Sequence, residues 1–512
     1  MKFTSTLVKN FYTVGIWTFV SRIFGFIRDI LLAAFLGSGP VGEAFIIAFS
    51  LPNIFRRFFA EGAFNAAFIP LFKKQMHNKE KARQFTFNTL STLILALITF
   101  CSLAMILMPF LVWAMASGFG SDSRFELTVY YGRITFPYIF MVSLSSLFSG
   151  ILNSHGNFKA TSAAPLVVNL FLIIALLSSY AWNLNTGLMI CISIPLSGLM
   201  QLLILIHASR RLGFSFKIIK PKFDKNLRRL TIIAFPAILS GGVIHINLLV
   251  GRQIASHFEG AIAWLNYADR LYQLPLGVIG IALGSVLLPT LSGKTLLNDP
   301  SQMNRAVHQC LKIAALLTLP ATAALIIIPL PLVSVLFERG VFSDIDSQYT
   351  ATALAIYALG LPAFILHKIF TPIFFSKGDT STPFKIAVIS MLANLLVALS
   401  LINFLGYLSP VVSTTISSWM MAALLYHQSR SLGFRVNGSL LKTCLKILVA
   451  TSILSIILIF VSIEASQLLI VSELRSLYLA ILIIFSSAIY FIFLWLLGIN
   501  KTIMSYVRVG HH

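Results

Sequence analysis

The segment that organises this chain reads Ser209-Arg210-Arg211-Leu212-Gly213-Phe214, and it recurs 220 residues later as Ser429-Arg430-Ser431-Leu432-Gly433-Phe434. Two further sets of matches have nearly the same spacing: Ala44 and Pro70 match Ala263 and Pro289 at offset 219, and Pro137 and Asn169 match Pro362 and Asn394 at offset 225. Because the matches keep one order and a nearly constant offset, the sequence predicts an internal duplication with a period near 220 residues.

The composition around these segments is that of a membrane protein. Of the 512 residues, 57% are hydrophobic and only 11% are charged, and the mean hydropathy is +0.89. Soluble domains contain about 25% charged residues. Apolar runs long enough to cross a bilayer, which takes about 20 residues, recur from end to end. Alternation at period two is absent, so α-helices are the predicted spanning elements. The fold class we expect is an all-α polytopic membrane protein.

Polar breaks divide the apolar runs into about fourteen predicted helices. Their approximate bounds are 11–36, 43–72, 85–115, 127–152, 161–181, 187–208, 230–256, 262–291, 306–337, 347–375, 384–405, 410–428, 443–463 and 475–497. Each repeat holds six helices, an even number, so both halves share one orientation and a pseudo-twofold axis along the membrane normal. We expect an N-terminal lobe at 1–229, a C-terminal lobe at 230–442, and a last segment at 443–512 with helices 13 and 14.

The loop charges predict the orientation. The chain has 38 Lys and Arg against 16 Asp and Glu, and 26 of the cations fall in the termini and in alternate loops. The opposite loops and helix ends carry only Arg124, Arg133, Arg339 and Arg475. By the positive-inside rule both termini are expected to be cytoplasmic, which agrees with an even number of spans. The same rule explains the basic excess better than nucleic-acid binding does.

Eight cations lie inside or near predicted spans: Arg22, Arg28, Arg56, Arg57, Arg252, Arg270, Lys312 and Lys368. A charge at a helix centre costs about 2.5–3.5 kcal/mol on insertion scales. Lys312 is near a helix end and can snorkel, and Arg252 lies close to an outer end. The remaining six fall in predicted helices 1, 2, 8 and 10. We expect them to face a wet cavity, to pair with acids, or both.

Few acids are placed to neutralise these cations. Asp29 lies two turns after Arg22, Glu61 follows Arg57 by four residues, and Asp269 points about 100° away from Arg270. Pairing therefore leaves a positive interior. Such an interior favours an anionic ligand, and guanidinium groups match phosphate oxygens in bidentate geometry. The alternative is that the charges only hold helices together.

Two prolines stand beside the interior cations. Pro52 precedes Arg56 by four residues, and Pro275 follows Arg270 by five. Each is predicted to break the backbone ladder, free a carbonyl toward the cavity and act as a hinge.

Motifs of enzymes were not found. The chain has no Walker-type glycine loop, no His-Glu-x-x-His motif and no nucleophile elbow, and its four cysteines stand singly without metal-binding spacing. We therefore expect no catalytic activity, no metal and no cofactor. Without a nucleotide site, uphill transport would draw on an ion gradient or the membrane potential.

The charged segments resemble one known family. They read Ser21-Arg22-Ile23-Phe24-Gly25-Phe26-Ile27-Arg28-Asp29, Leu51-Pro52-Asn53-Ile54-Phe55-Arg56-Arg57, Ala60-Glu61-Gly62-Ala63-Phe64 and Tyr267-Ala268-Asp269-Arg270-Leu271. These are similar to segments of the MurJ (MviN) lipid II flippases, in the multidrug/oligosaccharidyl-lipid/polysaccharide exporter superfamily. The resemblance implies two six-helix lobes plus a final helix pair. It also implies a substrate, the undecaprenyl-diphosphate-linked disaccharide-pentapeptide of peptidoglycan synthesis.

The resemblance implies roles for particular residues. The substrate-binding set is Arg22, Arg28, Arg56, Arg270, Lys368 and Asn53; the supporting or gating charges are Asp29, Glu43, Arg57, Glu61 and Asp269. This chain departs from the family at Glu43, where many members have Asp, at Ser50 in place of Lys, and at Gln273 in place of Glu. The resemblance implies that helices 13 and 14 form a groove for the isoprenoid tail, and we expect Leu454 and Ile484 to line it.

The function we expect is outward flipping of lipid II by alternating access in the bacterial cytoplasmic membrane, by a monomer whose partners are lipid II and bilayer lipids. A flippase for another polyprenyl-diphosphate glycan is the alternative. A cationic-drug exporter would need an acidic site, a membrane transferase would need carboxylates around a metal, and a channel would need a filter loop. The repeat also predicts that helices 2 and 8 begin opposite each other at the outer mouth, near Glu43 and Ala263.

Overall fold

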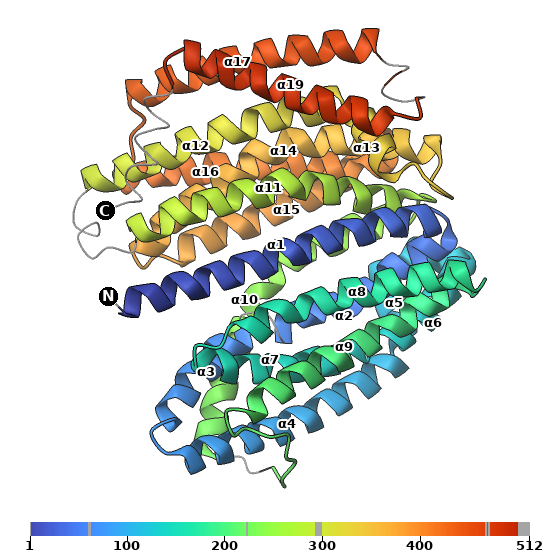
Figure 1. The fold of residues 1–512 in the computed structure, drawn as a ribbon, viewed down its shortest axis with the longest axis vertical. Coiled ribbons are helices and arrows are strands. Elements are labelled where there is room, and N and C mark those ends of the chain that lie inside the picture. The colour runs from blue at the N-terminus through green and yellow to red at the C-terminus, as the bar shows by residue number, and fades with distance from the viewer. Residues whose placement is uncertain are drawn as a thin grey trace. The chain divides into compact units, whose positions relative to one another are not determined.

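The computed structural model describes residues 2–59, 63–221, 224–291, 300–465, 468 and 472–499. Helices account for nearly all of the ordered backbone, and no strand occurs among these residues (Figure 1). The predicted all-α class is thereby confirmed. The chain forms two compact units, Met1–Ala263 (unit 1) and Trp264–His512 (unit 2). The lobes at 1–229 and 230–442 and the last segment at 443–512 remain predictions.

The helices follow one another with short connections. Unit 1 contains α1 (Lys2–Leu36), α2 (Pro40–Phe59), α3 (Ala63–Gln75), α4 (Lys79–Ile106), α5 (Met108–Met115), the 3-10 helix η1 (Ser117–Ser121), α6 (Ser123–Thr135), α7 (Tyr138–Ser154), α8 (Lys159–Ala181), α9 (Thr186–Arg210) and α10 (Lys225–Ala255). α11 (Ala261–Leu291) begins at the end of unit 1. Unit 2 continues with α12 (Pro300–Ile327), α13 (Pro329–Phe337), α14 (Asp344–Ser376), α15 (Ser381–Leu405), η3 (Gly406–Leu408), α16 (Ser409–Ser431), α17 (Gly438–Glu464) and α19 (Arg475–Leu496).

Each of the fourteen predicted spans falls on one helix or on two consecutive helices. Three spans divide beside a proline: Pro109 is the second residue of α5, Pro137 precedes α7 and Pro329 begins α13. Proline lacks an N–H and is therefore suited to the first turn of a helix, where that N–H would have no intrahelical partner. In the described ranges, nine helical stretches are long and apolar enough to cross a membrane. The number of crossings, fourteen, stays a prediction.

The repeated sequence segment forms the same helix end twice. After α9, the N–H of Phe214 donates to Ser209 O (3.1 Å), and Gly213 has a φ of 86°. After α16, the N–H of Phe434 donates to Ser429 O (3.2 Å), and Gly433 has a φ of 92°. This is the 6→1 bond of a Schellman ending, in which the left-handed position favours glycine.

The phenylalanine of each helix end is buried against a histidine. The Phe214 ring lies 5.6 Å from His155, and the Phe434 ring lies 5.5 Å from His308, between ring centroids. Phe214 is 3% exposed and Phe434 is not exposed at all. The two repeated segments thus share the same hydrogen bond, backbone geometry and packing, as a duplication predicts.

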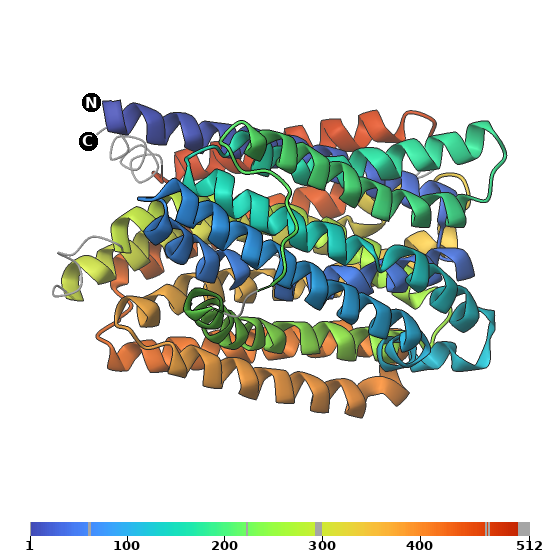
Figure 2. The same ribbon diagram turned by 90° about the horizontal axis from the view of Figure 1, so that it is seen from below.

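Packing within each unit is between long helices that run roughly along one direction (Figures 1 and 2). In unit 1, α8 packs against α1 and α9, and α2 packs against α6. In unit 2, α14 packs against α12 and α16, and the α17–α19 pair packs against α12 and α13. Many large apolar side chains point outward, including Leu95, Ile174, Leu396 and Ile456. An outer surface of this kind suits lipid contact.

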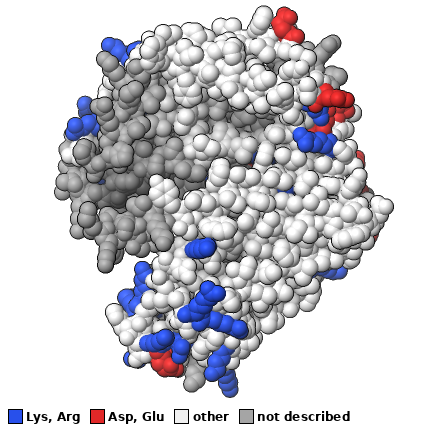
Figure 3. Space-filling view, viewed as in Figure 1, with Lys and Arg blue, Asp and Glu red and all other residues white. Residues whose placement is uncertain are grey.

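Charged side chains gather at helix ends. In unit 1, Figure 3 shows blue side chains over the end where α3 and α4 meet, and Lys73, Lys74, Lys79 and Lys81 there are exposed. In unit 2, blue side chains lie at the left edge of the view, and red and blue ones lie together at the right. The helix sides between are almost uncharged, as expected of surfaces inside a bilayer.

Candidate functional site

The first element of the site is Arg28 on α1. Its guanidinium donates to Asp29 Oδ1 from Nε (3.1 Å) and Nη2 (2.6 Å), and from Nη1 to Asn169 Oδ1 on α8 (2.8 Å). Arg28 is half-buried and Asp29 is 6% exposed. A planar fork can serve two acceptors at once, so the two partners fix the direction of the Arg28 side chain.

Asn169 ties this arginine to the packing of two helices. Its Nδ2 donates to Ser21 O (3.0 Å), so one amide joins two places on α1 that are two turns apart. A Cβ on Gly25, between them, would lie 3.4 Å from Asn169 Nδ2. Gly25 therefore lies directly beside the amide at the α1–α8 contact. The sequence marked Asn169 only as a repeat match and gave no sign of this role.

Arg22, by contrast, is exposed. The expected pairing of Asp29 with Arg22 was based on a two-turn spacing, but the ion pair found for Asp29 joins it to the adjacent Arg28 at 2.6 Å. The side chain of Arg28 is flexible enough for its guanidinium to reach the carboxylate of the next residue. A spacing rule based on Cβ directions does not predict such a contact.

Pro52 lies inside α2, which continues as helix on both sides of it. Proline has no N–H, so the carbonyl of Ala48, four residues earlier, has no intrahelical donor. Thr135 of α6 supplies one: its hydroxyl donates to Ala48 O at 3.1 Å, and Thr135 is fully buried. The expectation that this carbonyl faces a cavity is therefore wrong, because a neighbouring helix already satisfies it. A hinge at Pro52 stays a prediction.

The rest of α2 holds the other predicted residues of this helix. Asn53 is half-buried and donates from Nδ2 to Phe49 O (2.9 Å), within its own helix. Arg56 is half-buried one turn further on. The side chains of Arg57 and Glu61 lie outside the described residues.

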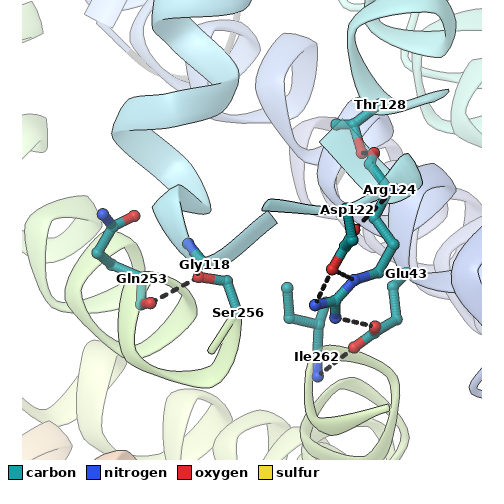
Figure 4. Close-up of polar contacts among 8 residues, drawn as sticks. All are labelled: Glu43, Gly118, Asp122, Arg124, Thr128, Gln253, Ser256 and Ile262. Carbon is teal, nitrogen blue, oxygen red and sulfur yellow. Dashed lines mark hydrogen bonds and ion pairs between the residues drawn. The ribbon is translucent and has the colours of Figure 1, made fainter. Parts of the chain in front are cut away.

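A buried ion-pair network lies where α2 begins (Figure 4). Arg124 donates from Nη1 to Glu43 Oε2 (2.7 Å) and from Nε and Nη2 to Asp122 Oδ2 (2.8 and 2.6 Å). Glu43 has no exposed surface and Arg124 is 7% exposed. The arginine also lies over the Phe119 ring at 4.4 Å. Two carboxylates thus flank one guanidinium, which makes the group net acidic.

The second oxygen of Glu43 reaches the start of α11. Oε1 accepts the N–H of Ile262 at 3.1 Å (Figure 4). A carboxylate is well placed there, because the first N–H groups of a helix lack intrahelical partners and carry partial positive charge. The predicted meeting of helices 2 and 8 at their starts is confirmed by this contact.

A second contact lies beside this network. Ser117 N donates to Gln253 Oε1 (3.1 Å) and Gly118 N donates to Ser256 Oγ (3.0 Å). Figure 4 shows Gly118 beside Ser256 of α10. A Cβ on Gly118 would come within 2.5 Å of the backbone of Ser256, so only glycine allows this approach.

Sequence reasoning assigned Arg124 to an ordinary outer loop and so missed its role. The one local signal is the spacing of Asp122 and Arg124, typical of a helix start: the Asp122 side chain caps α6 by accepting Arg124 N at 2.8 Å. The hydrogen bonds from Arg124 also hold the pKa of the Asp122 carboxyl below its usual range.

In unit 2 the predicted residues lie on α11 and α14. Arg270 and Asp269 are half-buried, and Asp269 accepts a hydrogen bond from Gln273 Nε2, so the Gln that replaces a family Glu contacts the acid of the motif. Lys368 is exposed, and a Cβ on Gly280 would lie 3.5 Å from its Nζ. Pro275 lies inside α11, which continues past it as helix.

Helices α17 and α19 correspond to predicted helices 13 and 14. Leu454 is 4% exposed and packs in a cluster with Leu458 and Leu482, whereas Ile484 is 69% exposed. Placing Leu454 in a tail groove is therefore wrong, because its side chain fills the contact between the helices. Ile484 remains available to lipid.

Known proteins match the chain over nearly its whole length. A sequence profile described as Lipid II flippase MurJ matches residues 32–497. The chain belongs to the MurJ lipid II flippase family. Family relatives named Probable lipid II flippase MurJ include one from Rickettsia prowazekii (strain Madrid E), 38% identical over 88% of this chain and 90% of its own length. Another, from Rhizobium meliloti (strain 1021), is 44% identical over 82% and 80%.

Solved structures agree on the fold of this MurJ family member. A lipid II flippase MurJ in an inward closed conformation has a TM-score of 0.80 and 24% identity, covering 96% of this chain and 99% of that one. An inward-facing multidrug resistance MATE family transporter of the MOP superfamily has a TM-score of 0.65 and 16% identity, covering 80% and 94%. The predicted transporter fold is confirmed.

Proposed function

We propose that this protein is a lipid II flippase, which moves the polyprenyl-diphosphate-linked peptidoglycan precursor to the outer leaflet of the bacterial cytoplasmic membrane. The observation that carries the proposal is the family match over residues 32–497. The interior cations agree with it, since a diphosphate needs positive charge in a region where an unpaired cation is costly.

In this proposal Arg22, Arg28, Arg56 and Arg270 bind the diphosphate, with Lys368 and Asn53 in support. Arg28 is held by Asp29 and Asn169 before the substrate arrives, so little side-chain freedom remains to be lost on binding. Arg22 is exposed and meets the ligand as a mobile charge. Asp29 and Asp269 support neighbouring groups, and Arg57 and Glu61 complete the charged set.

Glu43 is proposed as the gating charge. Its carboxylate joins α2 to Arg124 and to the first turn of α11, so releasing it frees three elements together. Alternating access needs a contact of this kind, stable when formed and lost as a unit. Pro52 and Pro275 are proposed hinges in the same cycle.

The remaining parts of the proposal come from sequence. Both termini are cytoplasmic, the protein acts as a monomer without enzymatic activity, and an ion gradient or the membrane potential supplies energy. Bilayer lipids and lipid II are its partners, and the isoprenoid tail contacts α17 and α19 at exposed positions such as Ile484.

Depletion of this protein in its host tests the proposal. Lipid II would be quantified in each leaflet, together with the other polyprenyl-diphosphate glycans of the cell. Lipid II accumulating in the inner leaflet alone is the expected result. Normal lipid II delivery with another glycan retained would instead support the alternative flippase.

A further inference from the structure

A basic pocket lies at the end of unit 2 where α17 begins and α19 ends. It has a volume of about 420 Å³ and is lined by Ser439, Lys442, Thr443 and Lys446 of α17 and by Gly498 and Ile499 after α19. Two ammonium groups and two hydroxyls thus face one space. None of the described residues that line the pocket is acidic.

A third lysine stands beside the pocket. Lys312 of α12 donates from Nζ to Ser439 Oγ (3.3 Å), and Lys446 donates from Nζ to Leu497 O (2.6 Å) at the end of α19. Lys442 is exposed and has no hydrogen bond or ion pair to any described residue. The stretches 300–320, 430–450 and 488–499, which surround this end, contain no Asp or Glu. The positive charge of the pocket is therefore not neutralised by this part of the chain.

The start of α17 adds to this potential. Asn437 caps the helix by accepting Leu440 N at 2.8 Å, and the residues that follow it directly line the pocket. The positive end of the helix dipole therefore lies at the pocket. This term supports a site that the lysines and hydroxyls already form.

Apolar side chains flank the pocket on the outer surface. Leu441 and Leu445 of α17 and Trp495 and Leu496 of α19 are each more than 60% exposed. A soluble anion would gain nothing from them, whereas a lipid would place its acyl chains against them and its phosphate in the pocket. The feature thus has the two-part chemistry of a membrane lipid.

We propose that this pocket binds the phosphate of an anionic phospholipid headgroup. Lys442 and Lys446 contact the phosphodiester, and the Ser439 hydroxyl, which accepts from Lys312, donates its own hydrogen to it. This end of α17 is the one that the loop charges predict to be cytoplasmic, where anionic lipids attract basic residues. A bound headgroup links α12, α17 and α19, so it stabilises the packing of α17 and α19 against the rest of unit 2.

Thermal unfolding of the purified full-length protein tests the site. The protein in neutral detergent would receive phosphatidylglycerol, phosphatidylcholine, or phosphatidylcholine with inorganic phosphate. Phosphatidylglycerol alone should raise the unfolding midpoint, and native mass spectrometry should show it retained. Lys442→Gln should weaken the apparent affinity about fivefold, as expected for one lysine near an anionic lipid surface. Because Lys442 is exposed and unpaired, the unfolding midpoint of Lys442→Gln in phosphatidylcholine should equal that of the wild-type protein.

Lys74→Gln is the matched control, since it removes another exposed lysine far along the chain. It should keep the full response to phosphatidylglycerol. Equal responses to the two lipids, or equal loss in both variants, would overturn the proposal. A rise with inorganic phosphate as large as with phosphatidylglycerol would assign the pocket to a free anion and overturn the lipid assignment. None of these measurements depends on transport, so their outcome does not depend on whether the protein is a lipid II flippase.

Discussion

Arg124 and Glu43 form an ion pair of 2.7 Å in which the carboxylate has no exposed surface, although the two residues are 81 positions apart. Glu43 also accepts the N–H of Ile262, so one side chain joins α2, α6 and α11. A buried carboxylate is tolerated only when its oxygens are satisfied. Both oxygens of Glu43 are satisfied, one by Arg124 and the other by the N–H of Ile262.

Glu43→Gln removes the charge and keeps an oxygen for Ile262. Breaking one side of a buried pair costs about 3–5 kcal/mol, and because Arg124 keeps Asp122 we expect the lower end of that range. The unfolding midpoint of the purified protein should fall, and complementation of a flippase-depleted strain should be reduced. Glu126→Gln, at an exposed acid in the first turn of α6, should change neither. If the two variants behave alike, Glu43 has no special role.

Thr135→Val tests the hydroxyl that serves the carbonyl freed by Pro52. An unsatisfied buried acceptor costs about 1–3 kcal/mol, so the free energy of unfolding should drop by that amount. Adding Pro52→Ala restores an N–H four residues after Ala48 and should recover part of the loss, which a double-mutant cycle would measure.

Thr128→Val is the control for this cycle. Thr128 is also fully buried, but its hydroxyl donates to Arg124 O within its own helix. It should destabilise the protein less than Thr135→Val, and Pro52→Ala should not rescue it. Additive effects of Thr135→Val and Pro52→Ala would refute the link between the two residues.

Replacing Arg28 by Lys keeps the charge and removes the fork. A single ammonium cannot hold Asp29 and Asn169 in the same geometry, so we expect complementation to be lost while membrane abundance stays normal. Arg22→Lys, at an exposed position on the same helix, should retain activity. Full activity of Arg28→Lys would show that charge alone suffices there.

Alanine at Arg22, Arg28, Arg56 or Arg270 should abolish complementation while leaving the protein in the membrane, because each change removes positive charge from the proposed diphosphate site. Membrane abundance would be measured by immunoblot beside the growth assay. Arg133→Ala, at an exposed cation outside the proposed set, should grow as the wild type does. Normal growth of all four variants would contradict the site.

Asp122 gives a pH prediction. Its pKa lies below the ordinary value of 3.8, because Arg124 donates to the charged form. The stability from this pairing is therefore complete above the ordinary value and is lost as pH falls through the lower, folded-state pKa. Asp122 should therefore add no pH dependence to the wild-type unfolding midpoint between about pH 5 and 8, because its contribution is constant there.

Asp122→Asn should lower the midpoint across that neutral range and narrow the difference from wild type at about pH 3. The effect should be small and weakened by salt, since the Asp122 side chain is 37% exposed. If the difference in unfolding midpoint between Asp122→Asn and the wild type widens on acidification, the predicted direction of the pH effect is wrong.

Much of the fold could be read from sequence because its determinants are local. The fourteen apolar stretches predicted from hydropathy each fall on one helix or on two consecutive helices. The repeated Ser-Arg-x-Leu-Gly-Phe segment indicated the duplication because a glycine-terminated helix end needs the same residues each time. The cost of charge in a bilayer identified Arg28, Arg56 and Arg270 as exceptional without knowledge of their neighbours. The sequence prediction merged the helices on either side of the breaks before α5, α7 and α13, although a proline stands at each break.

The partners of the charged groups were decided by tertiary structure. Arg28 meets Asn169 from 141 residues away, Ala48 receives its hydrogen bond from Thr135 at a separation of 87, and Glu43 meets Arg124 at a separation of 81. No periodicity connects such positions, since each depends on which helices pack side by side. Sequence by itself determined which groups are costly to bury, because that cost belongs to the residue and its depth in the membrane. Only the packing of the helices decided which partner stabilises each buried group, because a hydrogen bond needs a donor within about 3 Å in a set direction.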